Sequence, residues 1–326
     1  MIDPRLDIRY LQRTETTNTD DGKEVIAGLI QEQKTLPARY FYDAKGSLLF
    51  EQICELPEYY PTRTEAGILK QYAKAIADIT QSCELIELGS GSSTKTRFLL
   101  DAYHQKGQPV YYSPIDVSNS ILEKSAQQLL VQYPLLKVRG LVGTYDAALA
   151  DLPNPVASSR MLIFLGSSLG NFSKSDCDRF LKQISRVMNP GDYFLLGVDL
   201  QKPIEILEAA YNDSQGVTAA FNLNMLRHLN NLFGGDFQPD LCHHQAIYNQ
   251  IQHQIEMYLE VQQTHTVSLS KLDLIIDLQA GEKIRTEISR KFDLGQMQQQ
   301  LEAIGLNLCE SYTDTNEWFG LLLFQK

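Results

Sequence analysis

The segment Glu84-Leu85-Ile86-Glu87-Leu88-Gly89-Ser90-Gly91-Ser92-Ser93-Thr94-Lys95 is the stretch from which the rest of the chain can be interpreted. A short apolar run ends at two glycines, and the helix-like residues 95–103 follow directly. This layout is typical of the first strand, turn and helix of a nucleotide-binding α/β sheet. The glycines allow the turn and let a ligand approach the backbone. Taken alone, the pattern fits an ordinary strand-to-helix turn equally well.

The acidic residues of this segment favour one class of cofactor. Glu84 and Glu87 lie in the apolar run, and no third glycine stands at the spacing of dinucleotide-binding proteins. S-adenosylmethionine has no pyrophosphate to hold, and it offers an amine and ribose hydroxyls to carboxylates. The segment therefore indicates a site for S-adenosylmethionine.

The residues that follow alternate between apolar runs and helix-like segments. Strands are expected at 110–115, 136–142, 161–165 and 193–198, with helices between them. This alternation predicts an α/β fold with a parallel sheet and right-handed crossovers. Ligands of such sheets bind at the carboxyl ends of the strands. In this chain those ends carry Glu87, Gly89, Asp116, Thr144, Gly166 and Asn171.

The N-terminal part has a different texture. Residues 1–22 are polar and are expected to form a loose arm, and a helix is expected from Thr64, as its N-cap, to about residue 74. Between them, residues 40–60 hold six tyrosines or phenylalanines among charged residues. Aromatic residues often pack into a core under a loop. Because these tyrosines stand between prolines without helical or strand periodicity, we favour a cleft lined by their hydroxyls.

The part beyond residue 200 predicts a second domain. A long helix is expected at 217–233, and strands at 246–263, 266–269 and 272–278 suggest a small antiparallel sheet. A last helix, 294–304, and an antiparallel strand, 318–324, return to the main sheet. We expect a core of residues 63–200 and 291–326 and a substrate-binding domain of residues 1–62 and 201–290.

The composition restricts the kinds of partner and the compartment that we expect for this protein. The net charge of -11 argues against nucleic acid, because phosphate binding depends on Lys and Arg. No run approaches the roughly 20 apolar residues of a membrane span. The five cysteines are scattered and never form Cys-x-x-Cys, which favours free thiols in a reducing compartment. With no signal-peptide pattern at the N-terminus, we expect a cytoplasmic protein, and we expect it to be a monomer.

A metal site is not indicated. His243, His244 and His253 have no cysteine or carboxylate at ligand spacing, so we expect them on the surface or in turns. No Ser-His-Asp or Cys-His arrangement suggests covalent catalysis either.

With these motifs in place, the chain resembles the L-histidine Nα-methyltransferases of ergothioneine biosynthesis. The resemblance implies a Rossmann-like class I methyltransferase core, an additional α+β substrate-binding domain and S-adenosylmethionine as methyl donor. It implies hercynine, the Nα-trimethylated betaine of histidine, as the product. It covers residues 36–324 and rests on Tyr40-Phe41-Tyr42-Asp43 with Gly46-Ser47, and on residues 56–63, 87–93, 164–171, 213–222 and 284–292.

The resemblance also implies a cofactor site. Asp116 would hold the ribose hydroxyls, and Gly89 would let the methionine moiety approach the backbone. Relatives in the family have Asp-Phe where this chain has Thr144-Tyr145. Tyr145 can still flank the adenine ring, whereas Thr144 offers no charged acceptor to the adenine amino group. The implied cofactor-binding residues are Tyr42, Glu87, Gly89, Lys95, Asp116, Thr144 and Tyr145.

The implied substrate site has two parts. Tyr59, Gly166, Asn171 and Tyr211 correspond to positions that hold the amino and carboxylate groups, and Tyr59, Asn171 and Tyr211 are the expected catalytic residues. Met257, Glu287 and Ser289 correspond to the pocket around the imidazole. Glu287 would accept a hydrogen bond from one ring nitrogen, and Ser289 would serve the other.

Several alternatives remain open at this point. Glu287 can instead be a surface carboxylate that pairs with Arg285 or Arg290, because Arg285, Glu287 and Ser289 share one face of a regular strand. Another aromatic amino acid, such as tryptophan, can use the same amine and carboxylate clamp. A cofactor-binding regulatory module without chemistry is a third reading. Since the clamp contains no lysine or histidine, we expect water to accept the protons.

Overall fold

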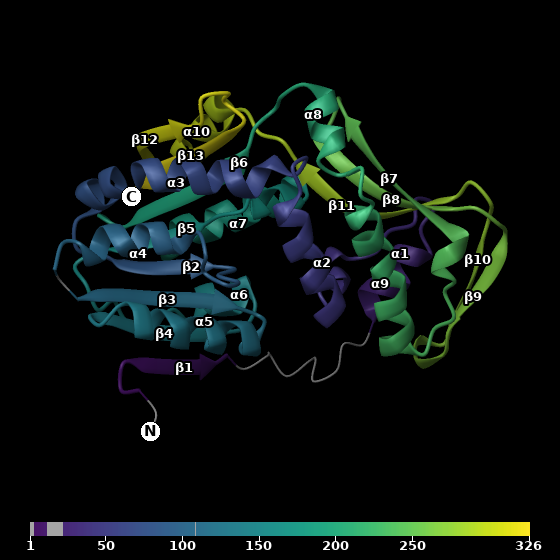
Figure 1. The fold of residues 1–326 in the computed structure, drawn as a ribbon, viewed down its shortest axis with the longest axis horizontal. Helices are drawn as coiled ribbons and strands as arrows, with labels where there is room; N and C mark the ends of the chain where they lie inside the picture. The colour runs from purple at the N-terminus through teal and green to yellow at the C-terminus, as the bar shows by residue number, and fades with distance from the viewer. Residues whose placement is uncertain (1–2, 12–21, 108) are drawn as a thin grey trace.

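The computed structural model describes residues 3–11, 22–107 and 109–326. In Figure 1 a large sheet with helices on both faces occupies one side of the molecule, and a smaller group of helices and strands occupies the other. No helix within the described ranges is long and apolar enough to cross a membrane.

The large sheet has eight strands in the order β1-β4-β3-β2-β5-β6-β13-β12. The pairs from β1 to β6 are parallel, and β13 runs antiparallel to both β6 and β12. The predicted parallel sheet is confirmed. Strands β2 and β5 are buried at every residue, which explains their continuous apolar sequences. The strands are β1 (Leu6–Tyr10), β2 (Glu84–Leu88), β3 (Val110–Asp116), β4 (Leu136–Val142), β5 (Arg160–Phe164), β6 (Tyr193–Asp199), β12 (Asn307–Thr313) and β13 (Phe319–Gln325).

Helices cover both faces of this sheet. On one face α3, α4 and α5 bury Leu69, Leu99 and Leu129. On the other, α6, α7 and α10 bury Phe180 and Leu301. These helices are α3 (Tyr60–Thr80), α4 (Thr96–His104), α5 (Asn119–Gln132), α6 (Tyr145–Ala150), α7 (Lys174–Val187) and α10 (Leu294–Glu302).

Strand β1 corrects the prediction of a loose arm over residues 1–22. It forms the edge of the large sheet, parallel to β4, with Ile8 opposite Gly140. Its sequence escaped notice because most of its side chains are partly or fully exposed, as an edge strand allows. Residues 6–10 therefore belong to the core sheet and not to the substrate-binding domain. The part of the predicted arm at 12–21 lies outside the described residues.

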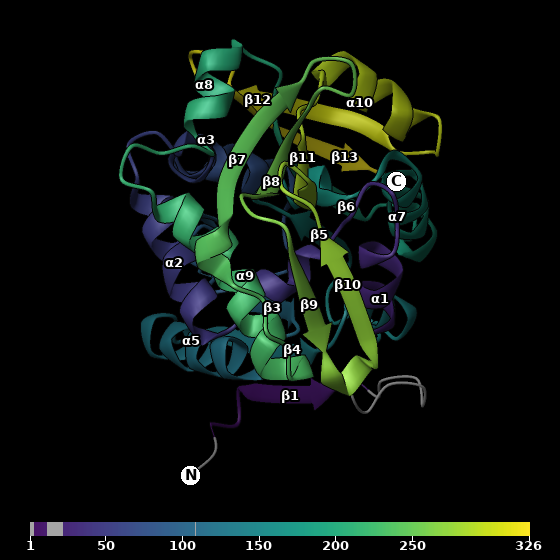
Figure 2. The ribbon, with the colours of Figure 1, turned by 90° about the vertical axis from the view of Figure 1, so that its right-hand side faces the viewer.

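The second part of the molecule joins the N-terminal segment to the residues after 200. A cluster of buried side chains connects Tyr40 and Phe41 with Met225 and Leu259. Figure 2 shows its three-stranded sheet, β11-β8-β7, and the separate β9–β10 hairpin. Apart from β1, the domain limits stay a prediction. The elements are α1 (Lys23–Leu29), η1 (Ala38–Phe41), α2 (Ala44–Glu55), α8 (Ile204–Ala209), α9 (Val217–Phe233), η3 (Pro239–Leu241), β7 (Cys242–Asn249), β8 (Gln254–Val261), β9 (His265–Leu269), η4 (Ser270–Leu272), β10 (Leu274–Leu278) and β11 (Lys283–Arg290).

Three expectations about the helices and strands are wrong, and one strand was missed. The segment 246–263 is two strands, because a turn with His253 at φ +49° reverses the chain between β7 and β8. The late strands form two sheets, since β9 pairs with β10 while β11 pairs with β8. Helix α3 begins at Tyr60 with Pro61 in its first turn, so Thr64 lies inside it. The polar strand β12 was not predicted.

Candidate active site

The glycine turn after β2 leaves space beside a fixed carboxylate. Gly89 has φ +73°, and a Cβ atom there would lie 2.5 Å from the Tyr145 hydroxyl oxygen, so a side chain does not fit. The Gly91 N–H donates to Asp116 Oδ2 at 2.9 Å, and the Ser118 N–H donates to Oδ1 at 2.9 Å. Each oxygen keeps a lone pair for a further donor. Asp116 is thus held at the end of β3, ready to accept from a diol.

Glu87 supports the turn from inside the core. Thr96 Oγ1 donates to its Oε1 at 2.5 Å, and the Tyr112 hydroxyl donates to Oε2. Burial raises the pKa of the Glu87 carboxyl to about 7, although both hydroxyls act in the opposite direction. Because Glu87 is buried and bonded to two core hydroxyls, it is placed to shape the turn, and its predicted contact with the cofactor stays a prediction.

Lys95 and Gly166 meet at a residue that sequence reasoning missed. Glu65 of α3 is fully buried and forms an ion pair with Lys95. The Gly166 N–H donates to its two carboxylate oxygens at 2.8 and 3.0 Å. The signal was present in the sequence: Glu65 precedes Ile68 and Leu69 by three and four residues, on the apolar face of a helix. An acidic residue on that face requires a buried partner.

The remaining predicted cofactor residues lie on separate elements. Tyr145, in the first turn of α6, packs edge-on against Phe164 at 5.5 Å between ring centroids. Thr144 caps the same helix, and its Oγ1 accepts from the Ala147 N–H at 3.3 Å. Tyr42 follows η1 and is 50% exposed, with its ring edge-on to Phe221.

Strand β11 packs closely against the loop that follows β5. This loop forms the short helix η2 (Ser168–Asn171). A Cβ atom at Gly170 would lie 2.9 Å from the backbone oxygen of Arg290. Glycine at 170 therefore permits the close approach that brings β11 to the end of the core sheet.

A β-bulge decides which side chains of β11 face the loop. Arg285 pairs with Tyr258 and Glu287 pairs with Met257, so Thr286 is the extra residue. Since Met257 and Tyr258 point to opposite faces of β8, Arg285 and Glu287 also point to opposite faces. The alternative that the two share a face is wrong.

Glu287 contacts the core side of the site. Asn171 Nδ2 donates to Glu287 Oε1 at 2.8 Å, and no ion pair within the described ranges joins Glu287 to Arg285 or Arg290. Burial raises the pKa of the Glu287 carboxyl to about 7, although the charge of Lys291 and the hydrogen bond from Asn171 oppose this shift. With a pKa near neutrality, the Glu287 carboxyl group can accept a hydrogen bond from a ring N–H when it is ionised.

The predicted clamp residues come together around Tyr211. Its hydroxyl donates to Ser289 Oγ at 2.9 Å, and its ring lies edge-on to that of Tyr59 at 6.0 Å. Burial raises the pKa of both tyrosines, so both are neutral at ordinary pH. Met257 is buried and shares the face of Glu287. The structure thus assembles Tyr59, Asn171, Tyr211, Met257, Glu287 and Ser289 at one place.

The expectation that no lysine lies among these residues is wrong. Lys291 Nζ donates to Ser289 Oγ at 2.8 Å and to the Tyr211 hydroxyl at 3.1 Å, and it pairs with Asp199 Oδ2 at 2.8 Å. Burial disfavours the ammonium form of Lys291, but Asp199 outweighs it and raises its pKa. Lys291 is therefore protonated and cannot serve as a base. Lys291 follows directly after β11 and continues the two-residue spacing of Glu287 and Ser289, which was a usable signal.

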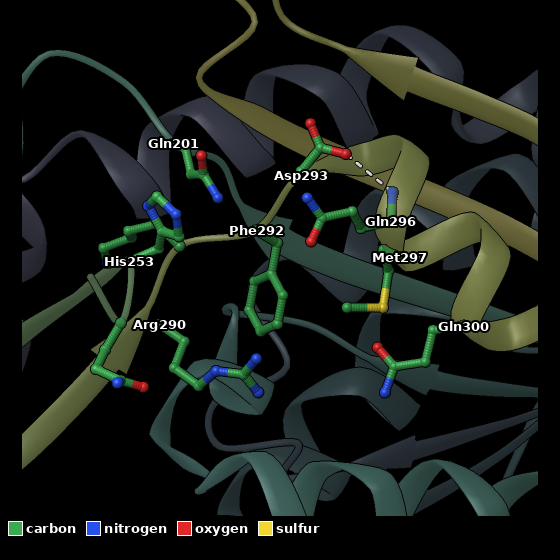
Figure 3. Close-up of a pocket in the computed structure, with 10 residues that line it drawn as sticks. Gln201, His253, Arg290, Phe292, Asp293, Gln296, Met297 and Gln300 are labelled. Atoms are coloured by element: carbon green, nitrogen blue, oxygen red, sulfur yellow. Dashed lines mark hydrogen bonds between the residues drawn. The ribbon is translucent and has the colours of Figure 1, made fainter. Parts of the chain in front are cut away.

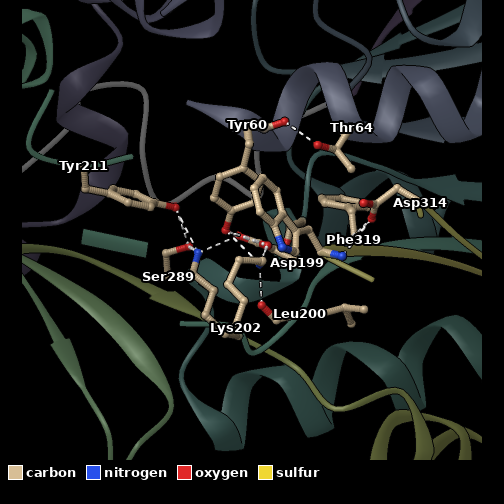
Figure 4. Close-up of polar contacts among 12 residues, drawn as sticks. Tyr60, Thr64, Asp199, Leu200, Lys202, Tyr211, Ser289, Asp314 and Phe319 are labelled. Carbon is tan, nitrogen blue, oxygen red and sulfur yellow. Dashed lines mark hydrogen bonds and ion pairs between the residues drawn. The ribbon is translucent and has the colours of Figure 1, made fainter. Parts of the chain in front are cut away.

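Asp199 holds this arrangement at the end of β6. It accepts from the Tyr60 hydroxyl at 2.9 and 2.8 Å and from Lys202 Nζ at 2.5 Å, as Figure 4 shows. Burial opposes its ionisation, but Lys291 and Lys202 hold the pKa of the Asp199 carboxyl below its usual value. Tyr60, next to the clamp residue Tyr59, is thereby tied to the core sheet.

His244 is not a surface histidine, as was expected. It is buried in β7, and burial lowers its pKa. Its Nε2 lies 2.8 Å from the Tyr211 carbonyl oxygen, and its Nδ1 lies 2.9 Å from Asn222 Nδ2. Neutral His244 thus fixes the backbone of Tyr211. No group of residues that could hold a metal ion occurs in the described part of the chain.

A separate small pocket lies against α10 (Figure 3). None of the predicted site residues lines it. Its wall consists of Gln201, Gln252, His253, Arg290, Lys291, Phe292, Asp293, Gln296, Met297 and Gln300.

Comparisons with known proteins identify the family of the chain. Residues 21–326 match a family model described as histidine-specific, S-adenosylmethionine-dependent methyltransferases. A histidine N-alpha-methyltransferase of Mycobacterium tuberculosis is 40% identical over 304 residues, covering 93% of this chain and 94% of its own length. One of Mycolicibacterium smegmatis is 39% identical, covering 92% and 93%. A 4-dimethylallyltryptophan N-methyltransferase of Aspergillus fumigatus is 29% identical and covers 87% of each chain.

Proposed function

The chain belongs to the S-adenosylmethionine-dependent, histidine-specific methyltransferases, and we propose that it adds three methyl groups in succession to the α-amino nitrogen of L-histidine. The product would be hercynine, as an early step of ergothioneine biosynthesis. The Rossmann-like class I methyltransferase fold implied by the resemblance is confirmed by the sheet order and by the family. The observation that carries the choice of substrate is the contact between Asn171 and Glu287 beside Tyr211 and Ser289.

The residues at the ends of β2, β3 and β4 fit the methyl donor. S-adenosylmethionine supplies an electrophilic methyl group on its sulfonium sulfur. Asp116 would accept from the ribose hydroxyls with its free lone pairs. Gly89, with open space beside the neighbouring Gly91, would let the methionine part approach the backbone. Tyr145 would flank the adenine, and Lys95, Glu87, Thr144 and Tyr42 would complete the site.

The clamp would orient the amino acid. Tyr59, Asn171 and Tyr211 are neutral groups whose O–H and N–H donate to a carboxylate and whose oxygens accept from an amine, and Gly166 would leave room beside them. Glu287 would accept from one imidazole nitrogen while Ser289 donates to the other. Holding the amine in line with the reacting methyl group supplies much of the rate enhancement.

Proton transfer needs no dedicated base in this proposal. Histidine loses three protons from its α-ammonium group as it gains three methyl groups, one proton before each transfer. The clamp tyrosines are neutral, and Lys291 is protonated, so none of them accepts a proton. Water would take the protons, and kcat at saturating substrate should rise with pH without a falling limb.

The test is a reaction with labelled S-adenosylmethionine and each of the twenty amino acids, followed by mass spectrometry. We expect label in histidine only, with three methyl groups on the α-nitrogen at excess cofactor. A product that stops at one methyl group, or carries a methyl group on the ring, would contradict the proposal.

The second candidate substrate is another aromatic amino acid such as tryptophan. The similarity to a tryptophan-derivative N-methyltransferase favours it, and the clamp does not depend on the ring. Glu287→Ala should raise the KM for histidine roughly 10- to 100-fold, the loss of a charge-assisted hydrogen bond, and leave any tryptophan reaction nearly unchanged. Glu260→Ala, in β8 of the same sheet, is the control. Equal losses for both substrates would make Glu287 structural.

We also propose that the protein acts as a cytoplasmic monomer. Its five cysteines are all free, which supports a reducing compartment. Light scattering coupled to size exclusion would test the monomer, and a mass of twice the chain would refute it.

A further inference from the structure

Two lysines and one aspartate form a buried cluster directly behind the clamp. The side chains of Lys291, Lys202 and Asp199 are 0%, 2% and 1% exposed. Lys202 also contacts the Tyr60 hydroxyl at 2.8 Å. Burial lowers the pKa of Lys202 to about 8, while that of Lys291 is raised, so both are cationic at neutral pH. The cluster therefore carries two positive charges against one negative charge.

Among residues 3–11, 22–107 and 109–326, no other carboxylate forms an ion pair with these lysines. Asp314 acts on Lys202, and Glu287 acts on Lys291, only through longer-range electrostatics. Asp314 Oδ1 already accepts from the backbone N–H groups of Trp318 and Phe319. A buried charge without a matching counterion is costly, so its retention calls for a function.

The excess charge reaches the cleft through one hydroxyl group. Lys291 uses its three N–H groups on Asp199, Ser289 and Tyr211. Because the Tyr211 oxygen accepts from an ammonium group, its own proton must point elsewhere, and here it points to Ser289. A carboxylate in the cleft can take that proton instead. An ammonium donor polarises the hydroxyl and strengthens the bond that the hydroxyl then makes.

We propose that Lys291 is a positioning residue that makes the site selective for a free α-carboxylate, because the unbalanced charge of the Lys291–Asp199–Lys202 cluster acts on the substrate through the Tyr211 hydroxyl. An amino acid amide, ester or peptide lacks the matching negative charge. This inference rests on the proposed function, which places the substrate carboxylate against Tyr211.

The test compares histidine with histidinamide, which lacks the negative charge but keeps the ring and the amine. Calorimetric titrations are done on the whole protein with S-adenosylhomocysteine bound. In Lys291→Met the affinity for histidine should fall roughly 10- to 100-fold, while that for histidinamide changes less than about threefold. KM for histidine should rise in step, with kcat at saturation nearly unchanged. Equal losses for both ligands would overturn the inference.

The variant is designed to fold. Lys291→Met leaves Asp199 paired with Lys202, so no charge is stranded. Lys291→Arg, which keeps the charge, should recover part of the selectivity. Lys34→Met, which breaks the ion pair with Glu282, is the control for loss of a lysine in the same part of the molecule, and its selectivity should match the wild type.

Two further outcomes distinguish failure of this inference from failure of the proposed function. If Lys291→Met does not fold, Lys202→Met removes the excess charge while Lys291 keeps its contacts, and an unchanged preference for histidine over histidinamide would then overturn the inference. If the wild-type protein does not prefer histidine among amino acids, the proposed function fails. A wild type that binds histidine and histidinamide equally refutes only the role of the charge.

Discussion

The proposed cofactor half and the proposed substrate half of the site are built in different ways. In the first, neighbouring strand ends of one sheet bring Gly91 beside Asp116, and backbone N–H groups fix the carboxylate. In the second, Asn171 meets Glu287 across 116 residues of sequence, and Tyr211 comes from a third segment. Apart from Tyr42, which packs on Phe221 of the second part of the molecule, the first half exists once the sheet has formed. The second half exists only when β11 lies against η2, so we expect substrate binding to depend on that docking and cofactor binding to depend on it little.

The largest effect should come from disturbing the docking itself. Gly170→Val would push its side chain into the backbone of Arg290 and move Glu287 away from Asn171. A misplacement of about 1 Å can cost about a hundredfold, so we expect kcat/KM for histidine to fall by at least that factor. Calorimetry should show S-adenosylmethionine affinity within about threefold of the wild type.

The matched control for this change is Gly67→Val. Gly67 lies in α3, and nothing stands within 4 Å of the position of its Cβ. Gly67→Val should leave kcat/KM for histidine and the affinity for S-adenosylmethionine unchanged. If Gly170→Val weakened cofactor binding as much as histidine binding, the two halves of the site would not be independent.

A change at Asp116 should have the opposite effect, weakening cofactor binding and leaving histidine binding unchanged. Asp116→Ala removes an acceptor for two hydroxyls and should weaken S-adenosylmethionine roughly 10- to 100-fold, or about 1.5–3 kcal/mol. Histidine affinity at saturating cofactor should stay constant. Calorimetric titration measures both, with Asp151→Ala, an exposed carboxylate beyond α6, as the control. An unchanged cofactor affinity would remove Asp116 from the site.

A pH profile sharpens the comparison further. The pKa of Glu287 is raised to about 7, so below pH 7 it is largely protonated and loses its charge-assisted bond to the imidazole. Between pH 5 and pH 7, kcat/KM for histidine should therefore rise about tenfold more in the wild type than in Glu287→Gln, which does not titrate. Parallel profiles would show that the ionisation of Glu287 does not matter to binding.

The smallest effect is expected at Thr144. Thr144→Asp keeps a helix cap and adds a charged acceptor, and it should tighten S-adenosylmethionine roughly two- to fivefold. Thr144→Ala should instead lower the free energy of unfolding by about 1 kcal/mol, because it loses the helix cap. Titration and thermal unfolding distinguish the two variants. Weaker cofactor binding by Thr144→Asp would place the adenine elsewhere.

The core sheet was predictable because its signals are local. Apolar runs buried on both faces identified β2 and β5, and the polar residue after a strand identified Asp116. The ends of parallel strands converge in space whatever the details of packing. The substrate residues were placed by resemblance to a family, since nothing in their spacing shows that Tyr211 lies against Ser289.

The features that escaped prediction depend on partners distant in sequence. Lys291 is charged and buried only because Asp199 reaches it from β6. Edge strand β1 has too few buried side chains to show a pattern, and it is recognisable only by its pairing with β4. The bulge at Thr286 reflects the register between β11 and β8, which the sequence of β11 does not contain.

The bulge has a consequence for changes of chain length. In a regular strand, inserting or deleting one residue moves the side chains beyond it to the opposite face of the sheet, because side chains alternate. At Thr286 one residue already stands outside the pairing, so loss of Thr286 would leave a regular ladder with Glu287 still opposite Met257. The same deletion at Ile288 would exchange Ser289 for Arg290 on the face toward η2. Deletion of Thr286 should therefore be tolerated. Deletion of Ile288 should abolish histidine binding.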